Sequence, residues 1–333
     1  MLRRLLFHGG VLVSGRGGQR IPFARFRGML RRMIFLTDQR RRGVIGVETL
    51  DAVTPSTVWR PQAALGWLDH PYAVQVDSAG TLFVADGGNA RIVAISAADG
   101  TTTMIQPPAP VGPLRGPRGL AIDGDLIVIA DTDNHRIVFG PARATSPTPW
   151  SAFGTASVSG SRGVGEFKAP VSVHVDSARR IVIADPGLGR LVRIDDSTGA
   201  GWTEVALPAG THATLAYGLA AGPGGDTTLI TDPDNGRILV LATDGTVTVA
   251  VDDIDSGSGA PRQLVMPVAA CMHGDNIVVA DAGAAQVTRW TPDPDADGGA
   301  GGWKLTEHLI GVPGPLGGPQ FSQLTGLAIG TLA

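Results

Sequence analysis

One unit recurs along the 333-residue chain, and each copy has an apolar stretch, an aspartate, a four-residue turn and a second apolar stretch. A well-formed copy is "DLIVIADTDNHRIVFG", which ends at Gly140. Short alternating apolar stretches around a turn predict two antiparallel strands. We call the aspartate before each turn the marker aspartate. The six markers, spaced by 45 to 54 residues, are Asp38, Asp86, Asp131, Asp185, Asp232 and Asp281.

A second shared segment precedes each marker: a loop rich in glycine and proline, here called the approach loop, and then a short strand. This strand begins 14 to 16 residues before the marker, near Pro71, Pro117, Pro170, Ala216 and Pro267. The final "FSQLTGLAIGTLA" has the loop and the strand but no aspartate, whereas the Asp38 copy lacks a first strand. The two chain ends therefore supply two halves of one unit. Pairing these halves would close a ring and remove exposed sheet edges.

The copy "ADTDNHRI" resembles the core of the NHL repeat, and "GEFKAPVSVHVD" and "GWLDHPYAVQVD" resemble its approach segment. NHL repeats form β-propellers of four-stranded blades around a channel. The resemblance implies an all-β fold, a six-bladed β-propeller over residues 31–333 that is closed by pairing the C-terminal strand with N-terminal strands. A basic N-terminal extension, residues 1–30, precedes it. The composition agrees, because 47 Gly and 24 Pro beside 43% hydrophobic residues indicate many strands and tight turns.

The marker aspartates invite a chemical interpretation, but their repetition favours a structural one. An arginine follows five positions later in four copies, at Arg91, Arg136, Arg190 and Arg237. We expect each carboxylate to accept N–H groups of its own turn and to pair with this arginine. An active site needs an asymmetric group at one place, not the same acid in every copy. His135 occurs in one copy only and is interpreted as a variable turn residue.

Two further patterns bear on catalysis. Ser172, His174 and Asp176 are the residue types of a hydrolytic triad, but they alternate along one strand about 6.6 Å apart. A triad needs hydrogen bonds near 3 Å, so we expect Ser172 and His174 to pack between blades. The amidating lyases resemble this repeat and hold zinc through histidines placed directly after the inner-strand proline. Those positions here are Tyr72, Arg118, Val171, Tyr217, Val268 and Thr325.

We therefore predict no catalytic residue and no enzyme activity. Gluconolactonase-like propellers need acidic residues in the channel, whereas the inner strands here are mostly neutral. Arg118, with Tyr72 and Tyr217 as polar neighbours, leaves a small-anion site at the channel mouth as an alternative.

Asp293, Asp295 and Asp297, followed by Gly298, have the alternating spacing with which carboxylates converge on Ca²⁺ in a tight loop. The last ligand position of an EF-hand would be Glu, and Lys304 stands there. A shortened calcium loop and a plain polar loop both remain open. No other cofactor is predicted.

Charge is distributed unevenly. Residues 1–43 hold eleven arginines and one acid, a net of +10, so the remainder of this chain of net charge −3 carries −13. The basic extension can dock into a protein assembly, bind nucleic acid or lie on an anionic membrane surface. We favour protein docking, because the acidic body would repel a polyanion. The docking residues would be Arg3, Arg4, Arg16, Arg20, Arg25, Arg27, Arg31 and Arg32.

These observations favour a non-catalytic scaffold, anchored through its N-terminal extension in a larger multiprotein assembly such as a phage-tail-like or similar bacterial machine. The alternatives are a lactonase- or lyase-type enzyme at the channel mouth and an RNA-binding NHL propeller. The single cysteine, Cys271, excludes an internal disulfide and a cysteine zinc site. With no run of 18 apolar residues and a poor secretory signal, we expect a cytoplasmic protein or one in a particle assembled there.

Overall fold

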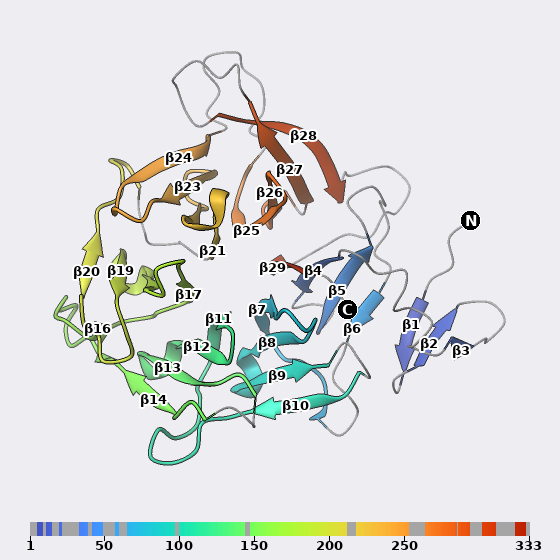
Figure 1. Cartoon of the computed structure of the whole chain (residues 1–333), viewed down its shortest axis with the longest axis horizontal. Helices are drawn as coiled ribbons and strands as arrows, with labels where there is room; N and C mark the ends of the chain where they lie inside the picture. Colours follow the sequence, from blue (N-terminus) through green and yellow to red (C-terminus); the bar gives the residue numbers. More distant parts are fainter. Residues whose placement is uncertain are drawn as a thin grey trace.

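The repeated segments form antiparallel strands, and these make four-stranded sheets arranged around a common centre (Figure 1). The structure is a computed structural model of the chain. Helical structure among the described residues consists of short 3-10 turns, and none of it is long and apolar enough to cross a membrane. The described residues are 5–8, 11–14, 20–21, 33–38, 42–48, 57–59, 65–96, 100–143, 147–211, 218–252, 264–284, 286–293, 302–310 and 324–330.

Five blades are built from consecutive strands and are named here by their marker aspartate. The Asp86 blade has β7 (Pro71–Val76), β8 (Leu82–Asp86), β9 (Arg91–Ile95) and β10 (Thr102–Ile105). The Asp131 blade has β11 (Pro117–Asp123), β12 (Leu126–Asp131), β13 (Arg136–Pro141) and β14 (Ser151–Phe153). The Asp185 blade has β17 (Ser172–Val175), β18 (Ile181–Asp185), β19 (Arg190–Ile194) and β20 (Thr203–Val205).

The other two blades follow the same plan. The Asp232 blade has β21 (Leu219–Ala221), β22 (Thr228–Asp232), β23 (Arg237–Leu241) and β24 (Val247–Asp252). The Asp281 blade has β25 (Pro267–His273), β26 (Asn276–Asp281), β27 (Gln286–Pro292) and β28 (Trp303–Ile310). In each blade the marker aspartate ends the second strand and the residue five positions later begins the third.

A further four-stranded sheet combines the two ends of the chain. In it β29 (Leu324–Gly330) pairs with β4 (Met33–Asp38), which pairs with β5 (Gly43–Glu48) and then β6 (Thr57–Trp59). Strand β29 contacts β7 on one side and β25 on the other. We expected six blades, whereas the structure has five blades built from continuous sequence. The marker Asp38 lies in the sheet assembled from both chain ends, so the number of marker aspartates exceeds the number of continuous blades by one.

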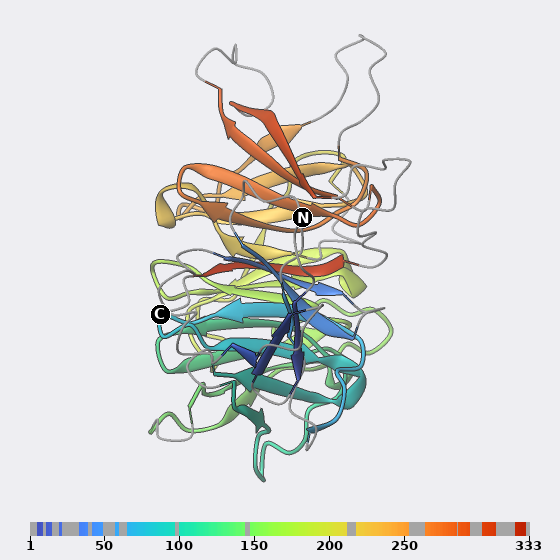
Figure 2. The ribbon, with the colours of Figure 1, turned by 90° about the vertical axis from the view of Figure 1, so that its right-hand side faces the viewer.

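Three short strands precede this composite sheet. Strands β1 (Leu5–His8), β2 (Val11–Ser14) and β3 (Arg20–Ile21) form a small antiparallel sheet, and β1 contacts β6. Figure 2 shows this small sheet in dark blue, in front of the ring. Of the predicted docking arginines, Arg20 lies in β3. The others, Arg3, Arg4, Arg16, Arg25, Arg27, Arg31 and Arg32, lie outside the described residues.

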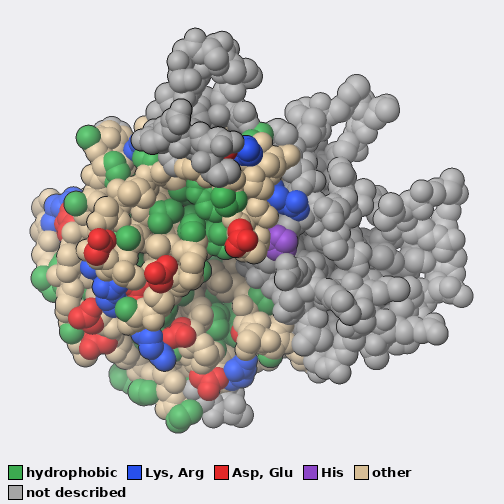
Figure 3. All heavy atoms as spheres, turned by 45° about the horizontal axis from the view of Figure 1, so that its top comes forward, with side chains coloured by type: hydrophobic (Ala, Val, Ile, Leu, Met, Phe, Trp, Pro, Cys, Tyr) green, Lys and Arg blue, Asp and Glu red, His purple; other side chains and the backbone are tan. Residues whose placement is uncertain are grey.

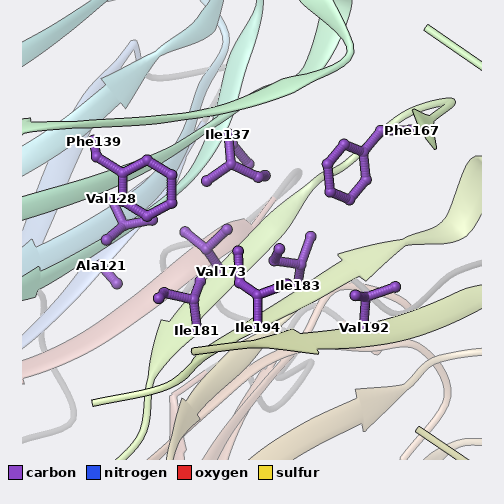
Figure 4. Packing of buried hydrophobic residues seen from close by; sticks show 11 residues of the cluster. Ala121, Val128, Ile137, Phe139, Phe167, Val173, Ile181, Ile183, Val192 and Ile194 are labelled. Atoms are coloured by element: carbon purple, nitrogen blue, oxygen red, sulfur yellow. The ribbon is translucent and has the colours of Figure 1, made fainter. Parts of the chain in front are cut away.

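The core lies between neighbouring blades. Every residue of β8, β18 and β22 is buried, because both faces of these second strands are covered. Figure 4 shows the packing between the Asp131 and Asp185 blades, where Phe139 and Ile137 lie opposite Ile181 and Ile194. This burial explains why the second strands read as nearly continuous apolar runs rather than as strict alternation.

The innermost strands of neighbouring blades lie so close that their backbones are in contact. A Cβ atom on Gly119 of β11 would lie 2.6 Å from the Cα of Ser172 in β17. A Cβ on Gly218 would likewise lie 2.8 Å from the carbonyl oxygen of Val268. The third residue of each inner strand segment, two positions after the residue that opens it, is accordingly small. These residues are Ala73, Gly119, Ser172, Gly218, Ala269 and Gly326.

Candidate functional site

Each marker aspartate, with the turn that follows it, forms what we call the marker corner. In the corner of Asp131, the aspartate side chain is fully buried. Its Oδ1 accepts the backbone N–H of Arg115 at 2.6 Å, and its Oδ2 accepts the Nε of Arg136 at 2.7 Å and the Nδ2 of Asn134 at 2.8 Å. In return, the backbone N–H of Asp133 donates to the carbonyl of Arg115 at 3.1 Å. The corner therefore fastens the turn, the third strand and the approach loop together.

The same arrangement recurs in other blades. Asp86 accepts the N–H of Asp69 at 2.6 Å and the Nε of Arg91 at 2.7 Å. Asp232 pairs with the Nε of Arg237 at 2.7 Å. Asp281 has Gln286 in place of the arginine and accepts the N–H groups of Val265 and Met266 at 2.7 and 2.9 Å. The side chain of Asp38 is outside the described residues.

The predicted pairing with the arginine is present, but the predicted hydrogen bonds to the marker's own turn are mostly wrong. At Asp86, Asp131 and Asp185 the side chain makes no capping bond to the turn that follows. The approach loop supplies the N–H donors instead, from 15 to 17 residues earlier in the chain. Only Asp281, among the described corners, also accepts N–H groups of its own turn, from Gly283 and Ala284.

An asparagine three positions after the marker completes three corners, and the sequence interpretation missed it. Asn89, Asn134 and Asn235 each donate through Nδ2 to the marker carboxylate, and each also donates to a carbonyl of the approach loop. The signal was present as Asp-x-x-Asn-x-Arg in the copies of Asp86, Asp131 and Asp232.

The Asp185 corner departs from the others. The distance between Nε of Arg190 and Oδ2 of Asp185 is 3.7 Å. The guanidinium donates instead to the carbonyls of Arg162 and Glu166, and its carbon lies 5.1 Å from the ring centroid of Trp202. Burial raises the pKa of Asp185, and the backbone N–H groups of Ala169 and Lys168 oppose this rise. The carboxylate is thus held mainly by backbone donors.

His135 occupies a turn position with left-handed backbone, at φ 55°. Arg42, Ala90, Gly189 and Gly236 have the same conformation at the same place in their copies. The side chain can therefore vary there, as the sequence indicated. The Nδ1 of His135 lies 2.7 Å from the carbonyl oxygen of Lys168, so this histidine also joins two neighbouring blades.

Ser172, His174 and Asp176 do not form a triad. Asp176 accepts the Nε of Arg180 at 2.8 Å, and the Oγ of Ser172 accepts the N–H of Leu219 from the next blade at 3.1 Å. Burial lowers the pKa of His174 to about 4, although Asp176 opposes the shift. The histidine is therefore neutral at physiological pH and packs within the ring.

Two of the three predicted channel-mouth residues lie together. The guanidinium carbon of Arg118 is 5.0 Å from the ring centroid of Tyr72. Both side chains are half-buried, and both stand directly after the proline that opens an inner strand. Tyr217 lies outside the described residues.

At the proposed calcium loop, Asp293 is described and Asp295 and Asp297 lie outside the described residues. The Nζ of Lys304 is 3.3 Å from Oδ1 of Asp293. Within the part of the chain that the structure describes, no three His, Cys, Asp or Glu side chains are grouped to hold a metal ion.

Comparison with known families identifies the repeat directly. The family profile of the NHL repeat matches residues 114–138, which contain the approach loop and the marker corner of Asp131. The chain contains an NHL repeat and folds as a β-propeller. The match covers one of the three copies in which the Asp, Asn and Arg contacts are all present, so the family pattern and the corner geometry describe the same element.

Solved structures agree with this fold. A nidogen/laminin complex aligns with a TM-score of 0.61 at 15% identity, covering 90% of this chain and 99% of that chain. A streptogramin B lyase aligns with a TM-score of 0.55 at 14% identity, covering 92% and 82%. A catalytically inactive virginiamycin B lyase from Staphylococcus aureus with quinupristin aligns with a TM-score of 0.56 at 15% identity, covering 91% and 84%. At these identities the likeness concerns the fold. No curated protein sequence matches this NHL-repeat propeller.

Proposed function

We propose that this NHL-repeat propeller is a non-catalytic scaffold that binds protein partners within a larger assembly, such as a phage-tail-like or similar bacterial machine in the cytoplasm. Its ring closes through the composite sheet of β29, β4, β5 and β6, which serves as a sixth blade. Residues 1–30 anchor it to the assembly. Closure of this kind gives a rigid body whose loops keep fixed positions, which suits a docking platform.

The observation that carries this proposal is the structural role of the marker aspartates. The carboxylates of Asp86, Asp131, Asp185, Asp232 and Asp281 are buried, and each is saturated by contacts that hold its own blade together. A carboxylate engaged in this way stabilises its blade and is not available to bind or activate a substrate. Loops of the same chain, by contrast, present large apolar side chains to solvent.

These exposed apolar side chains support protein binding. Trp67 and Val265, in two approach loops, are 58% and 52% exposed. Val158 and Val164 are 72% and 69% exposed on the loop that joins β15 (Thr155–Ala156) to β16 (Glu166–Phe167). Figure 3 shows hydrophobic side chains gathered near the middle of one face, with charged side chains of both signs around them. Buried aromatic anchors supply much of the energy of protein interfaces.

Affinity capture from the native source tests the proposal. Full-length chain and a variant lacking residues 1–30 are immobilised, and co-eluting proteins are identified by mass spectrometry. We expect a small set of proteins with the full chain and their loss with the shortened variant. A full chain that enriches no protein would overturn the scaffold function.

The fold of the lyase neighbours supports an enzyme as the second candidate. Incubation of the full chain with quinupristin, followed by mass spectrometry of the compound, separates the two. Intact quinupristin is expected for a scaffold, whereas steady product formation would favour the lyase. Single-stranded RNA at two salt concentrations addresses the third candidate, because phosphate contacts weaken as salt rises. Salt-dependent binding of that RNA would favour an RNA-binding propeller.

A further inference from the structure

Tyr72 forms a fixed platform at the start of β7. A Cβ atom on Gly87 would lie 2.8 Å from the Cε2 of Tyr72, so the ring lies directly against the glycine of the Asp86 corner. The carbonyl of Tyr72 accepts the Oγ1 of Thr37, in β4, at 2.6 Å. Ring and backbone are thus held from two sides, and Arg118 from the neighbouring β11 lies over the ring.

The polar groups of this pair are unused within the described part of the chain. The Tyr72 hydroxyl and the Arg118 guanidinium make no hydrogen bond or ion pair with any described residue. Other arginines behave differently: Arg136 holds Asp131, and Arg143 bridges Asp77 and Asp125. A half-buried guanidinium with no described anion beside it favours an acidic ligand.

Charges of both signs lie on the same end of the ring as this pair. Arg115 and Lys168, in the approach loops of the Asp131 and Asp185 blades, are exposed and form no ion pair among the described residues. Asp133 and Asp234 are exposed acids in the turns of their corners, and Asp69 pairs with Arg42. Arg115 and Lys168, as exposed cations without an ion pair among the described residues, add attraction for a carboxylate near the inner-strand starts.

We infer that Arg118 and Tyr72 bind a carboxylate in an acidic segment of a protein partner, with Arg115 and Lys168 adding longer-range attraction. The guanidinium offers two parallel N–H donors to one carboxylate, and the Tyr72 hydroxyl can donate a third hydrogen bond. Stacking on the tyrosine ring restrains the guanidinium plane before the ligand arrives. This inference rests on the proposed scaffold function and assigns its docking face.

Fluorescence anisotropy with a labelled peptide of alternating Glu and Gly tests the inference on the full-length chain. A peptide with Gln in place of Glu is the ligand control. Arg118→Gln removes the guanidinium and Tyr72→Phe removes the hydroxyl. Arg179→Gln is the matched protein control, because the charge change is identical. Arg179 is an exposed arginine in the turn between β17 and β18, at the opposite end of the inner strands, where it pairs with Asp123.

We expect binding of the Glu peptide but not of the Gln peptide. Arg118→Gln should weaken binding by roughly tenfold, in line with the loss of a charge-assisted hydrogen bond. Tyr72→Phe should weaken it by a smaller factor, and Arg179→Gln should leave it unchanged. Unfolding midpoints of the variants establish that each one is folded.

Equal affinity of wild type and Arg118→Gln would overturn the inference, as would equal binding of the Gln peptide or an equal loss with Arg179→Gln. Preference for labelled single-stranded RNA over the Glu peptide would replace it with a nucleic-acid surface. Affinity capture with Arg118→Gln separates a failure of this inference from a failure of the proposed scaffold function. A partner retained by Arg118→Gln leaves the scaffold intact and refutes the docking face, whereas absence of any partner refutes the scaffold.

Discussion

The Nε of Arg136 lies 2.7 Å from Oδ2 of Asp131, and the carboxylate of this pair is completely buried. The pair joins the end of the second strand to the start of the third, while the same carboxylate holds the approach loop. The corner is therefore one connected unit. Its removal should cost more than the loss of a surface ion pair.

Asp131→Ala should lower the free energy of unfolding by about 3 kcal/mol, because it leaves Arg136 and the N–H of Arg115 without their acceptor. Urea denaturation followed by fluorescence measures this change. Asp133→Ala is the control, since Asp133 is exposed two positions away and should change stability by less than about 0.5 kcal/mol. Equal effects of the two substitutions would contradict the structural role of Asp131.

Gly119→Ala tests the close approach of the inner strands. The added methyl would lie 2.6 Å from the Cα of Ser172, so we expect a loss of about 1–3 kcal/mol. Gly189→Ala provides the comparison. That glycine has φ 60°, its Cβ position is open, and Ala90 and His135 already adopt this conformation in their copies. Its cost should not exceed about 1 kcal/mol. A tolerated Gly119→Ala would mean that β11 and β17 do not touch at backbone level.

His174 should make stability fall as pH falls. Its pKa is lowered to about 4 in the folded protein from an unfolded value near 6.5, so the unfolded chain binds the proton first. The stability is fully present above about pH 6.5 and is lost progressively toward pH 4, by an amount on the order of 2–3 kcal/mol.

Urea midpoints between pH 7 and pH 4 measure this dependence, and His174→Gln should flatten it. His70→Gln is the control, because the His70 side chain is 60% exposed. A His174→Gln profile that follows the wild type would show that another group governs the acid sensitivity.

Cys271 should be unreactive in the folded protein. Burial raises the pKa of this thiol, and the thiolate is the form that reacts with disulfide reagents. Ellman's reagent should detect no thiol in native buffer and one per chain in denaturant, since the sequence has a single cysteine. Rapid labelling in native buffer would place Cys271 at an accessible surface.

The spacing of the repeat revealed most of the architecture. The five-residue interval between Asp131 and Arg136 predicted the ion pair, and the complementary chain ends predicted the pairing of β29 with β4. The first follows from a spacing that recurs in four copies, and the second from the two incomplete units at the chain ends. The offset from the opening prolines also brought Tyr72 and Arg118 to neighbouring inner strands, where the structure places them together.

Contacts between distant segments could not be derived in the same way. The N–H of Arg115 reaches Asp131 across 16 residues, and no local motif encodes that approach. The contact of Arg190 with Trp202 joins residues 12 positions apart, and the repeated motif does not encode it. Asn134 and its equivalents were visible as a repeated letter, but their second bond to an approach-loop carbonyl required the folded ring.

The most direct test of the account compares stability and partner capture in Asp131→Asn and Arg118→Gln, with full-length chains held at a temperature where both are folded. We predict that Asp131→Asn lowers the free energy of unfolding but captures as much partner protein as the wild type. Arg118→Gln should capture less at unchanged stability. Loss of partner by folded Asp131→Asn at unchanged stability would contradict the account, because the marker aspartate would then be a binding site and not a structural residue.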